Sequence, residues 1–267
     1  MSHIEKALEK AKKERAGIEV KEKVKDEIKD IKYEKPVYQY TRVMPVDENI
    51  LLENRILNQS NNSVVTDRYN LLRTQIFERT RDSGMNSILV TSVTKGEGKT
   101  LTSINLAISI ARELNQTVLL VDADLRSPTV HKLLGLQRDK GLSDYLLHDI
   151  PISELLINPG IEKLVILPGG RSVNNSAEIL GSPKMEALVQ EMKQRYKDRY
   201  VIFDSPPLLN SPDPIVFSSY VDGIVLVVEA GKTTTQQITE AMNLLKGKNI
   251  IGTVLNKAPI REKDYGY

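Results

Sequence analysis

The chain has 267 residues, of which 40% are hydrophobic and 27% are charged, and its formal net charge is +2. This balance is typical of a globular protein and gives no overall electrostatic signal for nucleic-acid binding. The chain contains no cysteine, which excludes disulfide scaffolds, thiolate catalysis and cysteine-based metal sites, and its three histidines are too few for an obvious metal cluster. Because no apolar run approaches the ~18 residues of a membrane span and the charged start lacks a signal-peptide core, we expect a cytoplasmic protein.

The first 36 residues carry 11 Lys or Arg and 9 Asp or Glu, which sets them apart from the rest of the chain. Ser2 and Glu5 have the spacing of a capping box, and small or apolar residues follow at helical intervals. The pattern predicts a solvated, partly helical extension, with a docking helix for a partner as the alternative. The next segment lacks periodicity apart from a short helix expected around Glu48 to Leu57, so residues 1–62 are interpreted as a charged helical extension and linker.

Residues 63–259 are expected to form one ordered domain in which helices and short apolar strands alternate. Thr66 or Asp67 is expected to cap the first helix. The expected strands are rich in Val and Ile and lie at Ser87–Thr91, Thr117–Val121, Leu164–Leu167, Tyr200–Phe203, Gly223–Val228 and Ile250–Leu255. The expected helices between them are Thr100–Leu114, one that starts at Pro183, and one around Ile238 to Leu245. Strands that are apolar on both faces favour a three-layer α/β domain, with helices on both faces of a mainly parallel central sheet.

The strongest motif is Val93-Thr94-Lys95-Gly96-Glu97-Gly98-Lys99-Thr100, between the first expected strand of this domain and a long helix. Gly96 and Gly98 allow backbone N–H groups to converge on phosphate oxygens, and the positive end of the helix adds to the attraction. In such a loop Lys99 would supply a point charge to the β and γ phosphates, and the Thr100 hydroxyl can ligate magnesium. The consensus G-x-x-x-x-G-K-[ST] is met at its last three positions, whereas Val93 occupies the first glycine position.

Two later strands end in acidic residues. Asp122 and Asp124 follow Leu119-Leu120-Val121, with Arg126 two positions further on, and Asp204 follows Val201-Ile202-Phe203. A single Asp at a strand end is often only a turn former, but open parallel sheets bind ligands at the carboxyl ends of their strands. Since magnesium prefers hard oxygen ligands, Thr100, Asp122 and Asp204 form the predicted metal site.

Together GEGKT, LLVDADLR and VIFDSPP resemble the Walker A, Walker A′ and Walker B motifs of the bacterial tyrosine kinases, over the chain from about Thr66 to its end. The opening MSHIEKALEK, with LPGGR at 167–171 and VLVVEAG at 225–231, is similar to the exopolysaccharide-locus, exosortase-associated branch. The resemblance implies a P-loop NTPase fold. It also implies an ATP- and magnesium-dependent protein-tyrosine autokinase that regulates exopolysaccharide biosynthesis and export.

The same resemblance implies how the site is divided. It assigns Lys99, Asp122, Asp124, Arg126 and Asp204 to catalysis, with Asp122 as the acceptor of the tyrosine hydroxyl proton. The ATP-binding set is Lys95, Gly96, Glu97, Gly98, Lys99, Thr100, Leu101 and Asn256, the last as a reader of the adenine edge. The implied partners are a membrane-embedded activator or polysaccharide co-polymerase, a cognate tyrosine phosphatase and further copies of the chain, with no nucleic acid. Recruitment to the inner face of the membrane would then go through a partner.

The sequence departs from the family pattern at its end and in its first domain helix. Residues 260–267 form a short polar tail whose Tyr265 and Tyr267 are the expected phosphoacceptors, in place of a dense tyrosine cluster. Tyr33, Tyr38 and Tyr40 are additional candidates. In that helix, Asp67, Asn70 and Arg73 replace the E-x-x-R-x-x-R pattern used for ring assembly.

The alternative function is that of a partition or positioning ATPase, which switches its assembly state on hydrolysis. Those ATPases share the deviant loop but usually carry lysine at the position of Thr94, whereas here the lysine is Lys95. A membrane-binding amphipathic helix at the C-terminus is also missing from the sequence pattern. A pseudoenzyme that binds ATP as a structural ligand is a third interpretation, and the complete set of acidic residues argues against it.

Overall fold

A computed structural model describes residues 41–58, 64–137, 140–196 and 198–259. These residues all belong to one compact unit, Tyr38–Tyr267. The expected helices of the N-terminal extension, the tail with Tyr265 and Tyr267, and the linker tyrosines lie outside the described residues.

The centre of the unit is an eight-stranded sheet with the order β1-β4-β5-β3-β6-β2-β7-β8. All neighbouring strands pair in parallel except β4 and β5, which are antiparallel. The strands are β1 Arg42–Val43, β2 Ser87–Ser92, β3 Thr117–Asp122, β4 Ile157–Asn158, β5 Leu164–Leu167, β6 Arg199–Asp204, β7 Gly223–Glu229 and β8 Ile250–Asn256. The predicted three-layer α/β fold with a mainly parallel sheet is confirmed.

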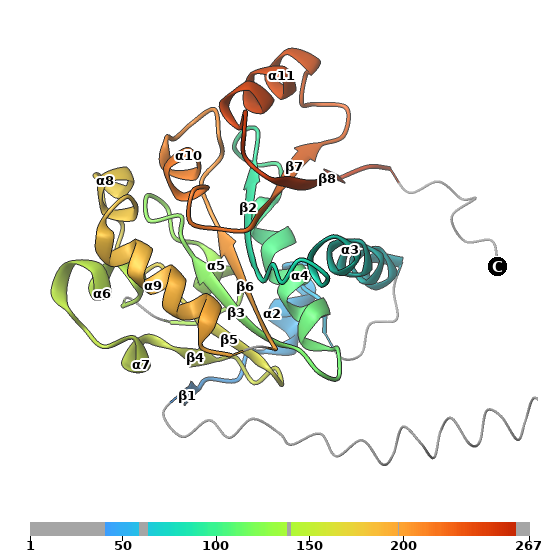
Figure 1. Cartoon of the computed structure of the whole chain (residues 1–267). Helices are drawn as coiled ribbons and strands as arrows, with labels where there is room; N and C mark the ends of the chain where they lie inside the picture. Colours follow the sequence, from blue (N-terminus) through green and yellow to red (C-terminus); the bar gives the residue numbers. More distant parts are fainter. Residues whose placement is uncertain (1–40, 59–63, 138–139, 197, 260–267) are drawn as a thin grey trace, which may run out of the picture. The chain divides into compact units, whose positions relative to one another are not determined.

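Helices cover both faces of this sheet (Figure 1). One face carries α2 Glu48–Glu53, α3 Val64–Thr80, α4 Lys99–Ala111 and α5 Val130–Leu133. The other carries α6 Leu142–His148, α7 Ile152–Leu155, α8 Ser176–Leu180, α9 Pro183–Gln194, α10 Asp213–Phe217 and α11 Thr235–Leu244. Within the described ranges, no helix is both long enough and apolar enough to cross a membrane.

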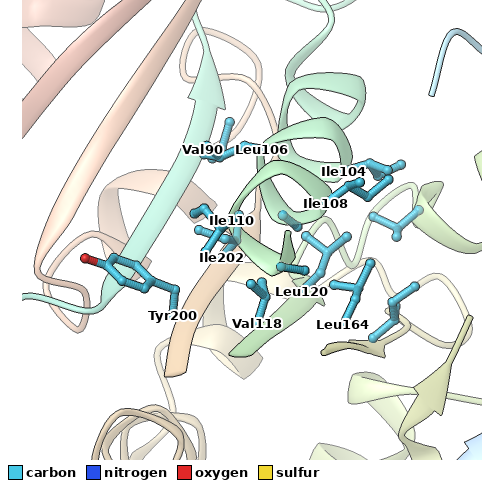
Figure 2. Close-up of a cluster of buried hydrophobic side chains, with 14 of the residues drawn as sticks. Val90, Ile104, Leu106, Ile108, Ile110, Val118, Leu120, Leu164, Tyr200 and Ile202 are labelled. Carbon is cyan, nitrogen blue, oxygen red and sulfur yellow. The ribbon is translucent and has the colours of Figure 1, made fainter. Parts of the chain in front are cut away.

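The core forms in two apolar layers because successive side chains of a strand point to opposite faces. The layer on the side of α2 to α5 is called the α4 layer here, and the layer on the side of α6 to α11 is called the α9 layer. In β6, Ile202 packs in the α4 layer, whereas Val201 and Phe203 pack in the α9 layer. Figure 2 shows the first layer, where Ile104, Ile108 and Ile110 of α4 lie against side chains of the sheet. The near-complete burial of α4 explains why its sequence is apolar almost all round.

The segment that the sequence analysis assigned to a linker contributes to this core. Asp47 caps α2 by accepting a hydrogen bond from the Asn49 N–H, and the helix ends before Arg55, whose φ of 58° lies in the left-handed region. Leu51, Ile56 and Leu57 are buried against the α4 layer. The expected helix around residues 48–57 is therefore present but shorter.

The start of α3 differs from the expectation. Thr66 and Asp67 lie inside its first turn, because the helix already begins at Val64. Asp67 still suits this place, since a negative charge in the first turn interacts favourably with the helix dipole.

Candidate active site

The fold brings the three sequence motifs to one edge of the sheet. Strands β3, β6 and β2 are parallel neighbours, so their carboxyl ends open on the same side. β2 leads into the loop of residues 93–98, called the phosphate loop below, while β3 ends at Asp122 and β6 ends at Asp204. Segments more than 100 residues apart in the sequence thus meet at one point.

The phosphate loop has the backbone that its glycines predict. Gly96 and Gly98 have φ values of 89° and 93°, a region that other residues rarely adopt. Gly98 is the residue before α4, and no side chain from the described part of the chain caps that helix end. The first N–H groups of a helix have no partner within it, so this end is available to an anion.

Lys99 is the centre of a cluster of opposite charges. Its Nζ lies 2.9 Å from Asp124 Oδ2 and 3.7 Å from Asp204 Oδ2, and it donates a hydrogen bond to Thr100 Oγ1 at 3.2 Å. Burial alone lowers the pKa of Lys99, but the neighbouring carboxylates outweigh burial and raise this pKa above its ordinary value. Lys99 is therefore a fixed positive charge at the end of the phosphate loop.

Asp122 and Asp204 are held side by side by the strand register, which pairs their Cα positions directly. Asp122 Oδ2 accepts hydrogen bonds from the Thr129 and Val130 N–H groups at 2.9 and 3.0 Å. Asp204 accepts one from Thr100 Oγ1 at 2.8 Å and one from Ser103 Oγ at 3.0 Å. Each carboxylate is thus oriented by donors of its own.

Burial raises the pKa of Asp122 to about 8, and the adjacent charge of Asp204 adds to the effect. Burial also raises the pKa of Asp204, against the opposing effect of Lys99. Asp122, Asp124 and Asp204 all lie near the one Lys99 ammonium, and the raised pKa values of Asp122 and Asp204 mean that ionising all three carboxyl groups together is unfavourable without a further positive charge. A divalent cation beside them would supply that charge and favour the ionised carboxylates, which is why the donor set fits magnesium.

Among the described residues, no group of three or more His, Cys, Asp or Glu side chains converges as a metal cage would require. In nucleotide sites, magnesium is usually held by one or two carboxylates together with phosphate oxygens and waters. The Thr100 hydroxyl, the third predicted ligand, lies next to Asp204.

The resemblance places Arg126 among the catalytic residues, but in the structure its side chain contacts Ser176 and Asp213. Its Nε donates to Ser176 Oγ at 2.9 Å and lies 3.5 Å from Asp213 Oδ1. Asp213 is fully buried, whereas 43% of the Arg126 side chain is exposed. No hydrogen bond or ion pair within the described part of the chain joins Arg126 to the Lys99 cluster, so its catalytic assignment stays a prediction.

The remaining predicted ATP-binding residues fall into two groups. Lys95 is exposed, and Leu101 packs partly against the α4 layer. Glu97 is 1% exposed, and Asn256 Nδ2 donates to the Glu97 carbonyl oxygen at 2.8 Å. Asn256 therefore contacts the phosphate loop at Glu97, which is part of that loop, and the adenine role of Asn256 stays a prediction.

Sequence reasoning missed several residues of the site. Ser103 had a usable signal, because a residue three positions after Thr100 lies on the same face of α4 and reaches Asp204. Ser176 and Asp213, which hold Arg126, had no such signal, since they come from separate elements of the α9 layer.

The sheet order, the glycine loop before α4 and the paired carboxylates define a P-loop nucleotide-binding fold. Residues 85–253 match the AAA domain family, which agrees with this class. The septum site-determining protein MinD of Pyrococcus horikoshii, solved with Mg-ADP, has the same fold, with a TM-score of 0.55 and 24% identity over 67% of this chain and 73% of that one.

Closer likeness is found among kinases. The tyrosine-protein kinase YwqD of Bacillus subtilis is 36% identical over 209 residues, which cover 77% of this chain and 86% of that protein. The kinase domain of the Escherichia coli tyrosine kinase ETK superposes with a TM-score of 0.68 and 27% identity, over 87% of this chain and 95% of that one. The chain therefore belongs to the bacterial tyrosine-protein kinase family and is an enzyme.

Proposed function

We propose that this kinase transfers the γ-phosphoryl group of ATP to Tyr265 and Tyr267 of its own C-terminal tail and thereby regulates exopolysaccharide biosynthesis and export. The observation that carries the proposal is the convergence of Lys99, Asp124, Asp122 and Asp204 beside a glycine loop at the open end of a helix. Phosphoryl transfer depends mostly on positioning and charge stabilisation, and this arrangement offers both.

The phosphate loop and the start of α4 would bind the β and γ phosphates through backbone N–H groups, and Lys99 would neutralise the charge that builds up between them. A magnesium ion held by Thr100, Asp122 and Asp204 would supply further charge neutralisation on the phosphate oxygens. Asp124 keeps the Lys99 ammonium in place through its 2.9 Å contact.

The transfer step is a displacement at phosphorus. The tyrosine oxygen forms a bond to the γ-phosphorus as the bond to the bridging β–γ oxygen breaks, and ADP leaves with that oxygen. The hydroxyl proton of the tyrosine would pass to the carboxylate of Asp122, which is buried beside Asp204 at the end of β3.

The partners follow from the same proposal. The resemblance to the exopolysaccharide-locus branch supports a membrane-embedded activator or polysaccharide co-polymerase, a cognate tyrosine phosphatase and a homo-oligomer in which one tail enters another active site. The kinase would work in the cytoplasm, at the inner face of the membrane, through its activator.

The test is incubation of the full chain with ATP and magnesium, followed by mass spectrometry of the C-terminal peptide. We expect phosphate on Tyr265 or Tyr267 and its absence when magnesium is chelated. ATP binding without phosphate on any tyrosine, even with the activator present, would refute autokinase activity. Free phosphate release stimulated by a surface or scaffold would instead favour the partition-type ATPase.

A further inference from the structure

Residues outside the three motifs donate hydrogen bonds to carbonyl oxygens of the phosphate loop. Asn256 and Lys257 stand at the end of β8, where Lys257 Nζ donates to the Gly96 carbonyl oxygen at 2.8 Å and Asn256 Nδ2 donates to that of Glu97 at 2.8 Å. Lys257 is itself positioned by Glu229, whose Oε2 lies 3.1 Å from Nζ. The end of β8 thus binds two successive carbonyl groups of the loop.

A second set of contacts passes through the buried side chain of Glu97. Its carboxylate accepts hydrogen bonds from the Thr94 N–H at 2.9 Å, from Thr94 Oγ1 at 3.1 Å and from Thr233 Oγ1. Thr233 lies in the turn after β7 and accepts a hydrogen bond from the Glu229 N–H at 2.9 Å. The Glu97 side chain therefore links two positions of the loop, Thr94 and Glu97, and connects the loop through Thr233 to the end of β7.

These contacts decide which way the peptide units of the loop face. Four loop carbonyls are occupied by donors from this chain: those of Thr94, Gly96, Glu97 and Gly98, bound by Ser92, Lys257, Asn256 and Thr102. Carbonyl groups that are held outward leave the neighbouring N–H groups facing inward, which is the geometry of an anion-binding nest. A hydrogen atom is the only substituent that fits at Gly98, where a Cβ would lie 2.2 Å from Asn256 Nδ2.

We infer that Thr233, Glu97, Asn256 and Lys257, called the brace here, are positioning residues that pre-form the phosphate loop before nucleotide arrives. The inference rests on the proposed nucleotide site and deepens it. The brace does not touch phosphate: it prevents the glycine-flanked peptide units from turning their carbonyl oxygens toward it. A loop that is ordered in advance loses less entropy on binding, so the brace raises nucleotide affinity.

Thr233 offers the sharpest test because valine has nearly the same shape without the hydroxyl. We expect Thr233→Val to weaken Mg-ADP binding about tenfold, equivalent to about 1.4 kcal/mol, as measured by isothermal titration calorimetry on the full chain. Thr233→Ser keeps the hydroxyl and should restore near-normal affinity. In kinase assays the valine variant should raise the KM for ATP with kcat within about twofold, the pattern of lost uniform binding.

A second variant guards against misfolding of the first. Lys257→Met removes the donor to Gly96 at a side chain that is 47% exposed, and we expect it to weaken Mg-ADP binding severalfold. Its matched control is Lys232→Met, because Lys232 pairs with the same Glu229 carboxylate at 3.3 Å, and no hydrogen bond joins it to the loop among the described residues. The control should bind as the unaltered chain does.

The outcomes separate the two ideas. If the unaltered chain binds neither Mg-ATP nor Mg-ADP, the proposed function fails and the brace fails with it. If the unaltered chain binds nucleotide and both Thr233→Val and Lys257→Met bind it equally well, the brace alone is overturned. Weakening by Lys232→Met equal to that by Lys257→Met would also overturn it, since the effect would then come from Glu229.

Discussion

The charge of Lys99 is balanced within the chain before any ligand arrives, since Asp124 and Asp204 lie 2.9 and 3.7 Å from its ammonium. The same ammonium is the group expected to meet the phosphates. Nucleotide binding at the proposed site would therefore add phosphate oxygens to the negative partners that Lys99 already has. This central position makes Lys99 the residue whose removal tests the site most directly.

We expect Lys99→Met to reduce tyrosine phosphorylation at least about 100-fold, because a positive charge aimed at the transferred group contributes several kcal/mol to the transition state. Circular dichroism should show that the fold is kept, since methionine has a similar length. Phosphate incorporation, measured by mass spectrometry, is the readout. Lys246→Met, at an exposed position beyond α11, is the control, and similar activity in the two variants would contradict the assigned site.

Asp222 offers a test of stability away from the site. Burial raises its pKa, but hydrogen bonds from Lys193, from Ser87 and from the Asn86 N–H outweigh burial and leave the pKa below its ordinary value. A carboxyl with a lowered folded-state pKa stabilises the fold above its unfolded pKa, and this contribution is lost as pH falls through the folded pKa.

We therefore expect Asp222→Asn to lower the free energy of unfolding by about 1–3 kcal/mol at neutral pH, with the difference shrinking below about pH 4. Urea denaturation at several pH values measures this. Asp149→Asn, which removes the exposed ion pair with Lys184, is the matched control and should have a much smaller effect. A constant difference at all pH values would mean that the charge of Asp222 is not the cause.

Among the elements, the longer strands could be predicted from the sequence, whereas the two-residue strands β1 and β4 could not. The expected strands match β2, β3, β5, β6, β7 and β8 to within one residue at each end, because buried parallel strands have a continuous apolar signature. β1 and β4 have two residues each and no period of their own. They exist because β1 pairs with β4 and β4 pairs with β5, which only the folded chain reveals.

The role of α2 leads to a prediction at this scale. Leu51 is 4% exposed and Leu52 is 49% exposed, although they are neighbours in one short helix. Leu51→Ala should destabilise the domain by about 2–5 kcal/mol through lost burial and a cavity, whereas Leu52→Ala should have little effect. Urea denaturation of both variants compares them directly. Equal effects would mean that residues 41–58 do not belong to the folding unit.

The site shows the same division between local and distant signals. The meeting of Lys99, Thr100, Asp122 and Asp204 at one edge of the sheet could be predicted because each ends a strand or opens a helix within a short motif. Thr233 and Lys257 could not, since they reach the phosphate loop from more than 130 residues away, and the side-chain types alone do not indicate that contact. Their role can be recognised only when the structure shows that the ends of β7 and β8 lie beside the phosphate loop.

At the scale of the whole molecule, the proposed function would require one chain to present its tyrosines to another. Asn70 and Arg73 of α3, which stand where the family's ring motif is expected, are engaged within the chain. Arg73 lies 2.7 Å from Glu113 and donates to the Ser109 carbonyl oxygen at 2.9 Å, and Ser109 Oγ donates to Asn70 at 3.0 Å. These residues hold α3 against α4. Assembly through Asn70 and Arg73 would therefore use side chains that already make contacts within the chain.

The tail tyrosines give the prediction at this scale. Tyr265→Phe combined with Tyr267→Phe should remove most phosphate from the chain while nucleotide binding is unchanged, because phenylalanine lacks the accepting oxygen. Mass spectrometry and calorimetry measure the two properties separately. Persistent labelling would move the acceptor role to Tyr33, Tyr38 and Tyr40, and weakened nucleotide binding would mean that the tail contributes to the pocket.

The direct pairing of Asp122 with Asp204 across β3 and β6 limits how these strands can evolve. Replacement of Ile by Val in them keeps the layer apolar and typically costs only about 0.5–1.5 kcal/mol. Gain or loss of one codon would instead turn a carboxylate to the opposite face of the sheet, away from its neighbour. Evolution can therefore change the apolar residue types in these strands, but it has to preserve the number of residues.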